Sequence, residues 1–134
     1  MFTLEMKVRL HDADAAGVLF FAKYFKFAHD AYEQYMETID FDFRNMIDNS
    51  SYLVLIVNAE SDFHKPMYAG DIIKVAMNSK KIGHTSYVLS YEISNGDGDL
   101  TAKVKTTHCC VDKKTGKPTK LPDKLVEELK KISL

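Results

Sequence analysis

The stretch FFAKYFKFAHDAYEQYME, residues 20–37, decides the fold. Apolar side chains recur in it at helical spacing, which predicts one long helix. The residues of this stripe are Tyr24, Phe27, Ala28, Ala31 and Tyr35. Further aromatic residues lie off the stripe, namely Phe20, Phe21, Phe25 and Tyr32. Aromatic side chains over so much of the circumference predict a helix that is buried on several sides.

Strand-like patterns flank this helix. Residues 2–10 alternate apolar and polar side chains, as a strand with one buried face does. After an irregular piece at 40–51, the run Leu53–Val57 is continuously apolar, which predicts a strand covered on both faces and continuing toward Phe63. Three further strands are predicted around residues 73–77, 86–94 and 100–111, and the segment NGDGD at 95–99 predicts a hairpin turn.

The order of elements predicts an α+β fold. A stripe formed by Leu125, Val126, Leu129 and Ile132 adds a short C-terminal helix. The simplest packing curls one antiparallel sheet around the long helix, and 134 residues leave room for a single domain, 1–134. Such a sheet leaves open edges that invite pairing, so we expect a homodimer or a homotetramer.

Composition limits the function classes. Lysine and arginine (18) nearly balance aspartate and glutamate (19), so we expect no nucleic-acid partner and no membrane partner. The neighbouring residues Cys109 and Cys110 point to opposite faces of a strand, which argues against a disulfide between them. The first ten residues lack the pattern of a signal peptide, so the expected location is cytoplasmic.

Candidate chemistry gathers just before the long helix, in HDADAAGVLFFAKYF at 11–25. Two carboxylates, Asp12 and Asp14, precede Gly17, where the missing side chain lets a ligand approach the backbone. A helix N-terminus offers backbone N–H groups without internal partners, which can polarise a carbonyl and stabilise an oxyanion. A nearby carboxylate supplies a base or a nucleophile. Together these groups suffice for acyl transfer.

This motif resembles the 4-hydroxybenzoyl-CoA thioesterase family of hotdog-fold proteins. The matching pattern is D12-A-D14-A-A-G17-V-L-F20-F21-A-K-Y24, and the segments FHKP at 63–66, YAGD at 68–71 and GHTS at 83–86 are similar to later strands of that family. The resemblance extends over nearly the whole chain. It implies a hotdog fold and a hydrolase that releases a carboxylic acid and free coenzyme A without a cofactor.

The resemblance also implies roles for individual residues. Asp14 would be the catalytic carboxylate, either attacking the thioester carbonyl or activating a water, and both roles stay open. The backbone N–H of Phe21 would polarise that carbonyl, beside Gly17, while Asp12 would be a structural neighbour. Some relatives carry histidine at the position of Phe21, but the backbone donor survives this substitution.

Candidate substrate contacts lie both near this motif and far from it in sequence. Among the aromatic residues, Tyr24 is the best candidate for touching the acyl group. Coenzyme A brings phosphates, so cations at the pocket mouth are expected, and Lys80, Lys81 and His84 are the candidates. Lys65 is a further candidate of lower rank.

Simpler interpretations compete with each assignment. Asp14 alone would more often cap a helix or close an Asx turn, and the aromatic residues mostly fill the core. The five histidines lack zinc-type spacing, so no metal is expected. There is no G-x-S-x-G motif, and cysteines inside a strand lack the setting that activates a thiolate.

Two other functions remain open, a thioesterase acting on acyl-carrier protein and a non-catalytic acyl-CoA-binding module. The acyl group is also open. The resemblance permits an aryl-CoA such as 1,4-dihydroxy-2-naphthoyl-CoA, beside short or medium aliphatic acyl-CoAs.

Overall fold

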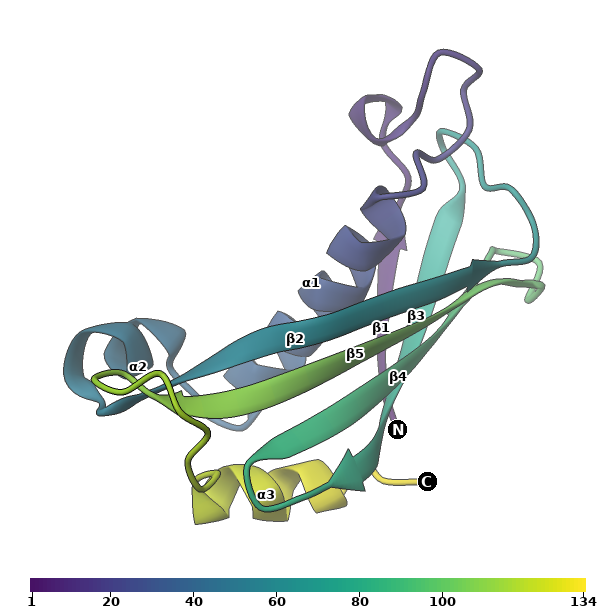
Figure 1. Ribbon diagram of the computed structural model, residues 1–134. Helices are drawn as coiled ribbons and strands as arrows, with labels where there is room; N and C mark the ends of the chain where they lie inside the picture. The colour runs from purple at the N-terminus through teal and green to yellow at the C-terminus, as the bar shows by residue number, and fades with distance from the viewer.

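A computed structural model describes residues 1–134 and shows one antiparallel sheet curled around a long helix, the predicted α+β architecture (Figure 1). The sheet order is β1-β3-β4-β5-β2. Its strands are β1 (Phe2–Lys7), β2 (Tyr52–Phe63), β3 (Ile72–Ile82), β4 (Ser86–Ser94) and β5 (Leu100–Asp112). The helices are a 3-10 turn η1 (Leu10–Asp12), α1 (Lys23–Thr38), α2 (Phe43–Asn49) and α3 (Asp123–Lys130).

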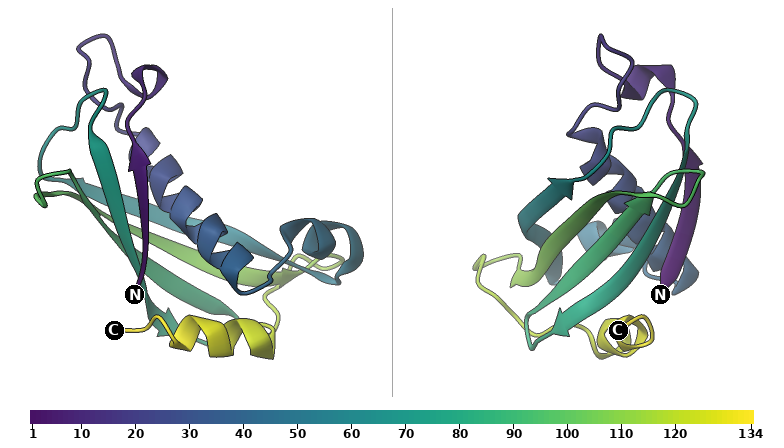
Figure 2. Two further views of the ribbon diagram at one scale, coloured as in Figure 1. Left: turned by 180° about the vertical axis from the view of Figure 1, so that it is seen from behind. Right: turned by 90° about the vertical axis from the view of Figure 1, so that its right-hand side faces the viewer.

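Helix α1 lies across the concave face of the sheet (Figure 2) and buries one face against it. The buried residues include the predicted stripe and add Tyr32 and Met36. The opposite face carries exposed side chains such as Lys26, Glu33 and Glu37. The expectation of burial on several sides is therefore wrong for the single chain. The expectation rested partly on Phe20 and Phe21, which lie before the helix and are exposed.

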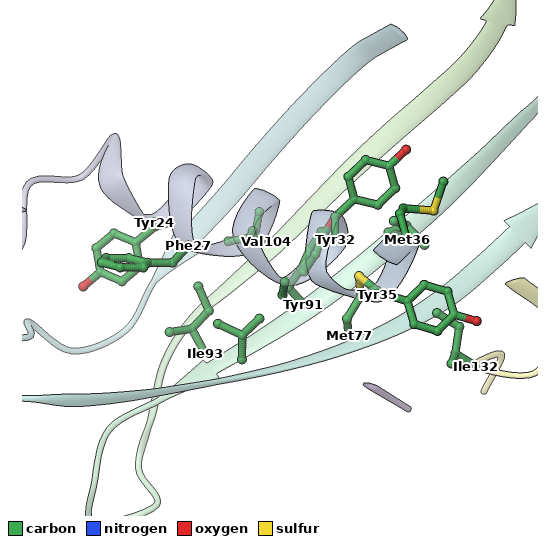
Figure 3. Packing of buried hydrophobic residues seen from close by; sticks show 14 of the residues in the cluster. Tyr24, Phe27, Tyr32, Tyr35, Met36, Met77, Tyr91, Ile93, Val104 and Ile132 are labelled. Atoms are coloured by element: carbon green, nitrogen blue, oxygen red, sulfur yellow. The ribbon is translucent and has the colours of Figure 1, made fainter. Parts of the chain in front are cut away.

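The core fills the space between α1 and the inner face of the sheet (Figure 3). It contains a buried polar cluster. The hydroxyls of Tyr32 and Tyr87 are 2.8 Å apart, and His108 stacks on Tyr87 with ring centroids 4.8 Å apart. The Nε2 atom of His108 lies 2.8 Å from the Thr106 hydroxyl. Burial, followed by repulsion from His29, lowers the pKa of His108 to about 4, so the imidazole is neutral in the folded protein at pH 7.

Strand β2 is an edge strand that pairs only with β5. The predicted strand is confirmed, including its extension to Phe63, but the expected cover on both faces is wrong within this chain. Leu55, Ile56 and Val57 are all exposed, and the register shifts between Ile56 and Asn58. The chain itself supplies no cover for this apolar run.

Helix α2 was missed by the sequence patterns, which left residues 40–51 irregular. Its N-terminus is stabilised by the side chain of the residue that precedes it, and its C-terminus by a side chain far along the sequence. The Asp42 carboxylate accepts a hydrogen bond from the Asn45 backbone N–H (3.1 Å). The Lys113 ammonium donates to the carbonyls of Met46 (2.9 Å), Ile47 (2.6 Å) and Ser50 (2.6 Å). A contact 63 or more residues away leaves no local signal in the sequence.

The predicted turn at 95–99 and the predicted C-terminal helix are both present. The Asn95 side chain closes the turn between β4 and β5 by accepting hydrogen bonds from the backbone N–H groups of Asp97 and Asp99 (3.0 Å each). Helix α3 packs on the end of the sheet, where the Ser79 hydroxyl donates to the Leu129 carbonyl (2.6 Å). Both cysteines are free thiols. None of the helices combines the length and the apolar character that a membrane span needs.

Candidate active site

The loop between β1 and α1 forms a small hairpin that ends at the helix. Ala13 and Leu19 form an isolated antiparallel bridge, and the Asp14 backbone N–H donates to the Val18 carbonyl (2.8 Å). Gly17 turns the chain with φ +77°, a conformation that favours glycine. A Cβ at this position would meet nothing within 4 Å. The turn, rather than lack of space, therefore requires glycine in the isolated chain.

Asp14 is exposed, and its side chain is fixed by the loop backbone. Its Oδ1 accepts hydrogen bonds from the N–H groups of Ala16 (2.8 Å) and Val18 (3.3 Å), which is the Asx-turn role of such residues. Its Oδ2 has no hydrogen-bond partner and no ion pair within the chain. The carboxylate is thus oriented through one oxygen and free at the other.

Asp12 differs from Asp14 in its surroundings. It is only 2% exposed, and its Oδ2 accepts a hydrogen bond from the Arg9 backbone N–H (2.9 Å). Its Oδ1 has no hydrogen bond and lies 3.9 Å from Lys23 Nζ and 3.6 Å from His11 Nε2. The sequence predicted Asp12 as a structural neighbour of Asp14, without predicting that its carboxylate is buried.

The start of α1 presents unpaired backbone donors. The N–H of Lys23 donates to the Phe20 carbonyl (2.9 Å), and the N–H of Phe20 donates to the Asp12 carbonyl (3.0 Å). Between them, the N–H groups of Phe21 and Ala22 donate to no protein acceptor. They lie at the positive end of the helix dipole and next to solvent, since Phe21 is 60% exposed. Donors of this kind can hold a carbonyl oxygen as it gains negative charge.

A groove of 340 Å³ opens beside these donors. Its apolar walls include Val18, Phe21, Tyr24 and Phe63, and the Tyr24 and Phe63 rings meet edge to face at 5.0 Å. The Tyr24 hydroxyl has no hydrogen-bond partner within the chain, and Figure 3 shows it directed away from Tyr32 and Tyr35. Burial raises the pKa of Tyr24, so its hydroxyl stays protonated at pH 7.

The polar side of the same groove is formed by His64 and Lys65. From the sequence, Lys65 was a candidate of lower rank, and neither His64 nor Phe63 was predicted to line the site. The sequence signal that could have identified them is the FHKP segment, which ends the long strand β2 beside the start of α1. Lys65 forms an ion pair with Asp99 (3.3 Å) across the end of the sheet.

Lys80, Lys81 and His84 do not join this groove within the chain. Strand β3 begins opposite the last residue of β1, at the helix-start end of the sheet, and runs to a turn at the other end beside α3 (Figures 1 and 2). Lys80 lies in the register shift between Ser79 and Lys81 near the end of β3, and both lysines are exposed and free of ion pairs. The structure therefore separates them from Asp14 by the length of a strand.

Two other features do not compete with this groove. A larger groove of 630 Å³ lies on the outer face of the sheet, lined by charged residues including Glu5, Lys74 and Glu92. It has neither a helix terminus nor an aromatic wall. The chain also contains no group of three or more His, Cys, Asp or Glu side chains placed to hold a metal ion.

Comparison with known proteins places the chain among thioesterases. A family model described as the thioesterase-like superfamily matches residues 8–129. The chain is 34% identical to a 1,4-dihydroxy-2-naphthoyl-CoA hydrolase of Nostoc punctiforme, over 96% of this chain and 86% of that protein. A hydrolase of the same name from Rippkaea orientalis is also 34% identical, over 92% of this chain and 91% of that protein.

Solved structures agree with this relationship. The crystal structure of a 1,4-dihydroxy-2-naphthoyl-CoA thioesterase from Synechocystis superposes with a TM-score of 0.92 at 29% identity, covering 96% of this chain and 94% of that one. A hypothetical protein from Aquifex aeolicus superposes with a TM-score of 0.87 at 26% identity, covering 96% and 99% of the two chains.

Proposed function

Because this chain belongs to the thioesterase-like superfamily and has its hotdog fold, we propose that it hydrolyses an acyl-CoA thioester to a carboxylic acid and free coenzyme A. The observation that carries the proposal is the two backbone N–H groups without acceptors at Phe21 and Ala22, at the start of α1 beside an aromatic groove. The preceding loop orients the Asp14 carboxylate, which accepts a hydrogen bond from the groove residue Val18. The finer relationship, to 4-hydroxybenzoyl-CoA thioesterases, is supported by the motif around Asp12, Asp14 and Gly17.

In the proposed reaction, the thioester carbonyl oxygen accepts a hydrogen bond from the Phe21 N–H, which withdraws electrons from the carbonyl carbon. The free oxygen of Asp14 then acts in one of two ways. It attacks the carbon, expels the coenzyme A thiolate and leaves an anhydride that water opens, or it takes a proton from a water that attacks instead. A single turnover in ¹⁸O-labelled water identifies the anhydride route when water opens the anhydride at the Asp14 carbon, because only that route can leave label in the Asp14 carboxylate.

The proposed acyl group is aromatic. The walls formed by Phe21, Tyr24 and Phe63 suit a flat ring, and the free Tyr24 hydroxyl can bond to a ring hydroxyl. His64 offers a second polar contact on the other side of the groove. The names of the relatives support 1,4-dihydroxy-2-naphthoyl-CoA as the substrate.

We propose that the working enzyme is a homodimer formed through the β2 edges, or a homotetramer in which two such dimers pair. Antiparallel pairing of two β2 strands would cover the apolar run at Leu55–Val57. A twofold axis between the two edges makes the paired strands antiparallel.

This dimer gives Lys80, Lys81 and His84 a role that they cannot have in one chain. Antiparallel pairing at β2 turns the α3 end of one sheet toward the helix-start end of the other. The partner's Lys80 and the partner's Lys81 would then lie near the mouth of the groove, where the phosphates of coenzyme A are held. The two free cysteines support a reducing, cytoplasmic location for this enzyme.

The test is a panel of thioesters followed by release of free thiol. It contains 1,4-dihydroxy-2-naphthoyl-CoA, other aryl-CoAs, aliphatic acyl-CoAs and the same acyl groups on acyl-carrier protein. Fastest turnover of an aryl-CoA supports the proposal, and preference for the carrier-bound acyl group replaces it with a carrier-protein thioesterase. Tight binding of acyl-CoA without any thiol release would identify a non-catalytic binding module.

A further inference from the structure

The buried carboxylate of Asp12 carries a charge that the loop does not fully satisfy. Only one of its oxygens, Oδ2, accepts a hydrogen bond, from the Arg9 N–H. The other oxygen, Oδ1, is buried and has no hydrogen-bond donor. Buried charges require a partner, and Oδ1 has two cations nearby, His11 at 3.6 Å and Lys23 at 3.9 Å. The His11 side chain is mostly exposed, so Lys23 is the more buried of the two cations.

Asp12 therefore contacts the chain on both sides of Phe21. On the N-terminal side, its carbonyl accepts a hydrogen bond from the Phe20 N–H (3.0 Å). On the C-terminal side, its carboxylate attracts the ammonium of Lys23, the first residue of α1. Lys23 in turn donates its backbone N–H to the Phe20 carbonyl (2.9 Å), which closes the turn.

These contacts fix the peptide group that joins Phe20 to Phe21, and this peptide carries the free Phe21 N–H. We infer that Asp12 is a positioning residue, which orients the Phe21 N–H toward the thioester carbonyl. Its carboxylate attracts the Lys23 ammonium, and its backbone carbonyl accepts the Phe20 N–H. The inference rests on the proposed function, since it assigns a direction to the donor used there. It also gives the two acids of the motif separate tasks, with Asp14 touching the substrate and Asp12 acting through the main chain.

If Asp12 served only to form the turn, the charge of its side chain would not be needed. An asparagine at position 12 can still accept the Arg9 N–H, and its carbonyl can still accept the Phe20 N–H. What asparagine cannot do is hold the Lys23 ammonium by charge. Asp12→Asn and Lys23→Gln therefore remove the same interaction from its two ends.

The experiment measures kcat, KM and melting temperature for Asp12→Asn, Lys23→Gln and the double variant. Lys26→Gln is the matched control, because it removes an exposed ion pair from the same helix, Lys26 with Asp30 at 3.0 Å. We expect each single variant to lower kcat by about 10-fold to 100-fold, the range that slight misplacement of a reacting group produces. KM should change by less than about twofold, and the double variant should be no slower than the slower single variant.

A second measurement is independent of activity. The backbone amide of Phe20 should exchange its hydrogen faster in Asp12→Asn and in Lys23→Gln, and at the parental rate in Lys26→Gln. If the parent hydrolyses no thioester, the proposed function fails, while this exchange rate still decides whether Asp12 orders the peptide.

Several results overturn the inference. One is parental kcat in both single variants, and another is an equal loss of kcat in Lys26→Gln. Additive losses in the double variant, or a fall in kcat that follows the melting temperature, would also remove the positioning role. If Asp12→Asn does not fold, Lys23→Gln decides alone, and parental kcat in that variant overturns the inference.

Discussion

The Asp14 Oδ1 atom lies 3.3 Å from the backbone nitrogen of Val18, a residue that lines the aromatic groove. This hydrogen bond ties the carboxylate to the rim of the groove and leaves Oδ2 unbonded. The Asx turn and the proposed chemistry are therefore compatible, because they use different oxygens of one side chain. The turn orients the oxygen that is proposed to react.

Asp14→Asn should fold like the parent and lose almost all turnover. Asparagine keeps an oxygen for the N–H groups of Ala16 and Val18 but lacks the charge of a base or nucleophile. Loss of such a group typically lowers the rate by about 100-fold to 10,000-fold. Thiol release and a melting curve on the same preparation test this. Near-parental kcat would show that the carboxylate belongs to the turn only.

Asp14→Ala is the companion variant, since it removes the turn together with the charge. It should be as inactive as Asp14→Asn and should also melt at a lower temperature, because two backbone N–H groups lose their acceptor. If the asparagine variant melted as low as the alanine variant, its loss of activity would not be evidence for chemistry.

Replacing Lys80 and Lys81 together by alanine should raise KM and leave kcat nearly unchanged. These side chains are proposed to bind the phosphates of coenzyme A across the dimer, away from the reacting carbonyl. The control replaces Lys74 and Lys103, which are exposed on the outer face of the sheet. Steady-state kinetics on both double variants should show the rise only for the first. An unchanged KM there would exclude the two lysines from substrate binding.

Ile56→Asp should separate the subunits and abolish activity. The side chain is 44% exposed on the edge strand, and a carboxylate there would place a charge in the apolar run that the proposed dimer buries. Light scattering should then give a mass near 15.3 kDa, the mass of one chain. Leu134→Asp, at an exposed terminal residue, should keep the parental mass and rate. An active monomer of the parent chain would contradict the proposed assembly.

The stability of the folded chain should fall as the pH drops from about 6.5 to about 4. Burial and the nearby His29 lower the pKa of His108 to about 4, so the unfolded state binds this proton more readily than the folded state. This contribution to stability is fully present above pH 6.5. It decreases by about 3 kcal/mol, in order of magnitude, on the way to pH 4.

Urea unfolding at a fixed protein concentration and several pH values measures this loss. His108→Gln is the control, because it keeps a polar side chain near Thr106 but cannot take up the proton. Its free energy of unfolding should depend less steeply on pH between 6.5 and 4 than that of the parent. Equal slopes for the two proteins would show that His108 does not contribute.

The sequence predicted the elements that carry a local period and missed those held by distant contacts. Alternation located the strands, and helical spacing located α1 and α3. Helix α2 was missed because Lys113, far along the chain, holds its C-terminal carbonyls. The apolar run in β2 was correctly identified as a strand, but its exposure depends on the position of that strand in the sheet, which the run alone does not contain.

The candidate active site was predictable to a similar degree. The motif located Asp14, Gly17 and the helix start, because these residues are close in sequence. The burial of Asp12 depends on Lys23 and the packed helix start, and the groove residue His64 comes from a different strand end. The motif separated the two acids by role, and only their three-dimensional placement shows that Asp12 is buried while Asp14 is exposed.

The donor at position 21 belongs to the main chain, and this has an evolutionary consequence. Any side chain except proline leaves that N–H in place, so mutation can change the residue facing the groove without removing the donor. Substrate range can therefore drift at this position while turnover persists. A saturation library at Phe21, screened on aryl and aliphatic thioesters, would show which side chains change the substrate range while turnover is retained.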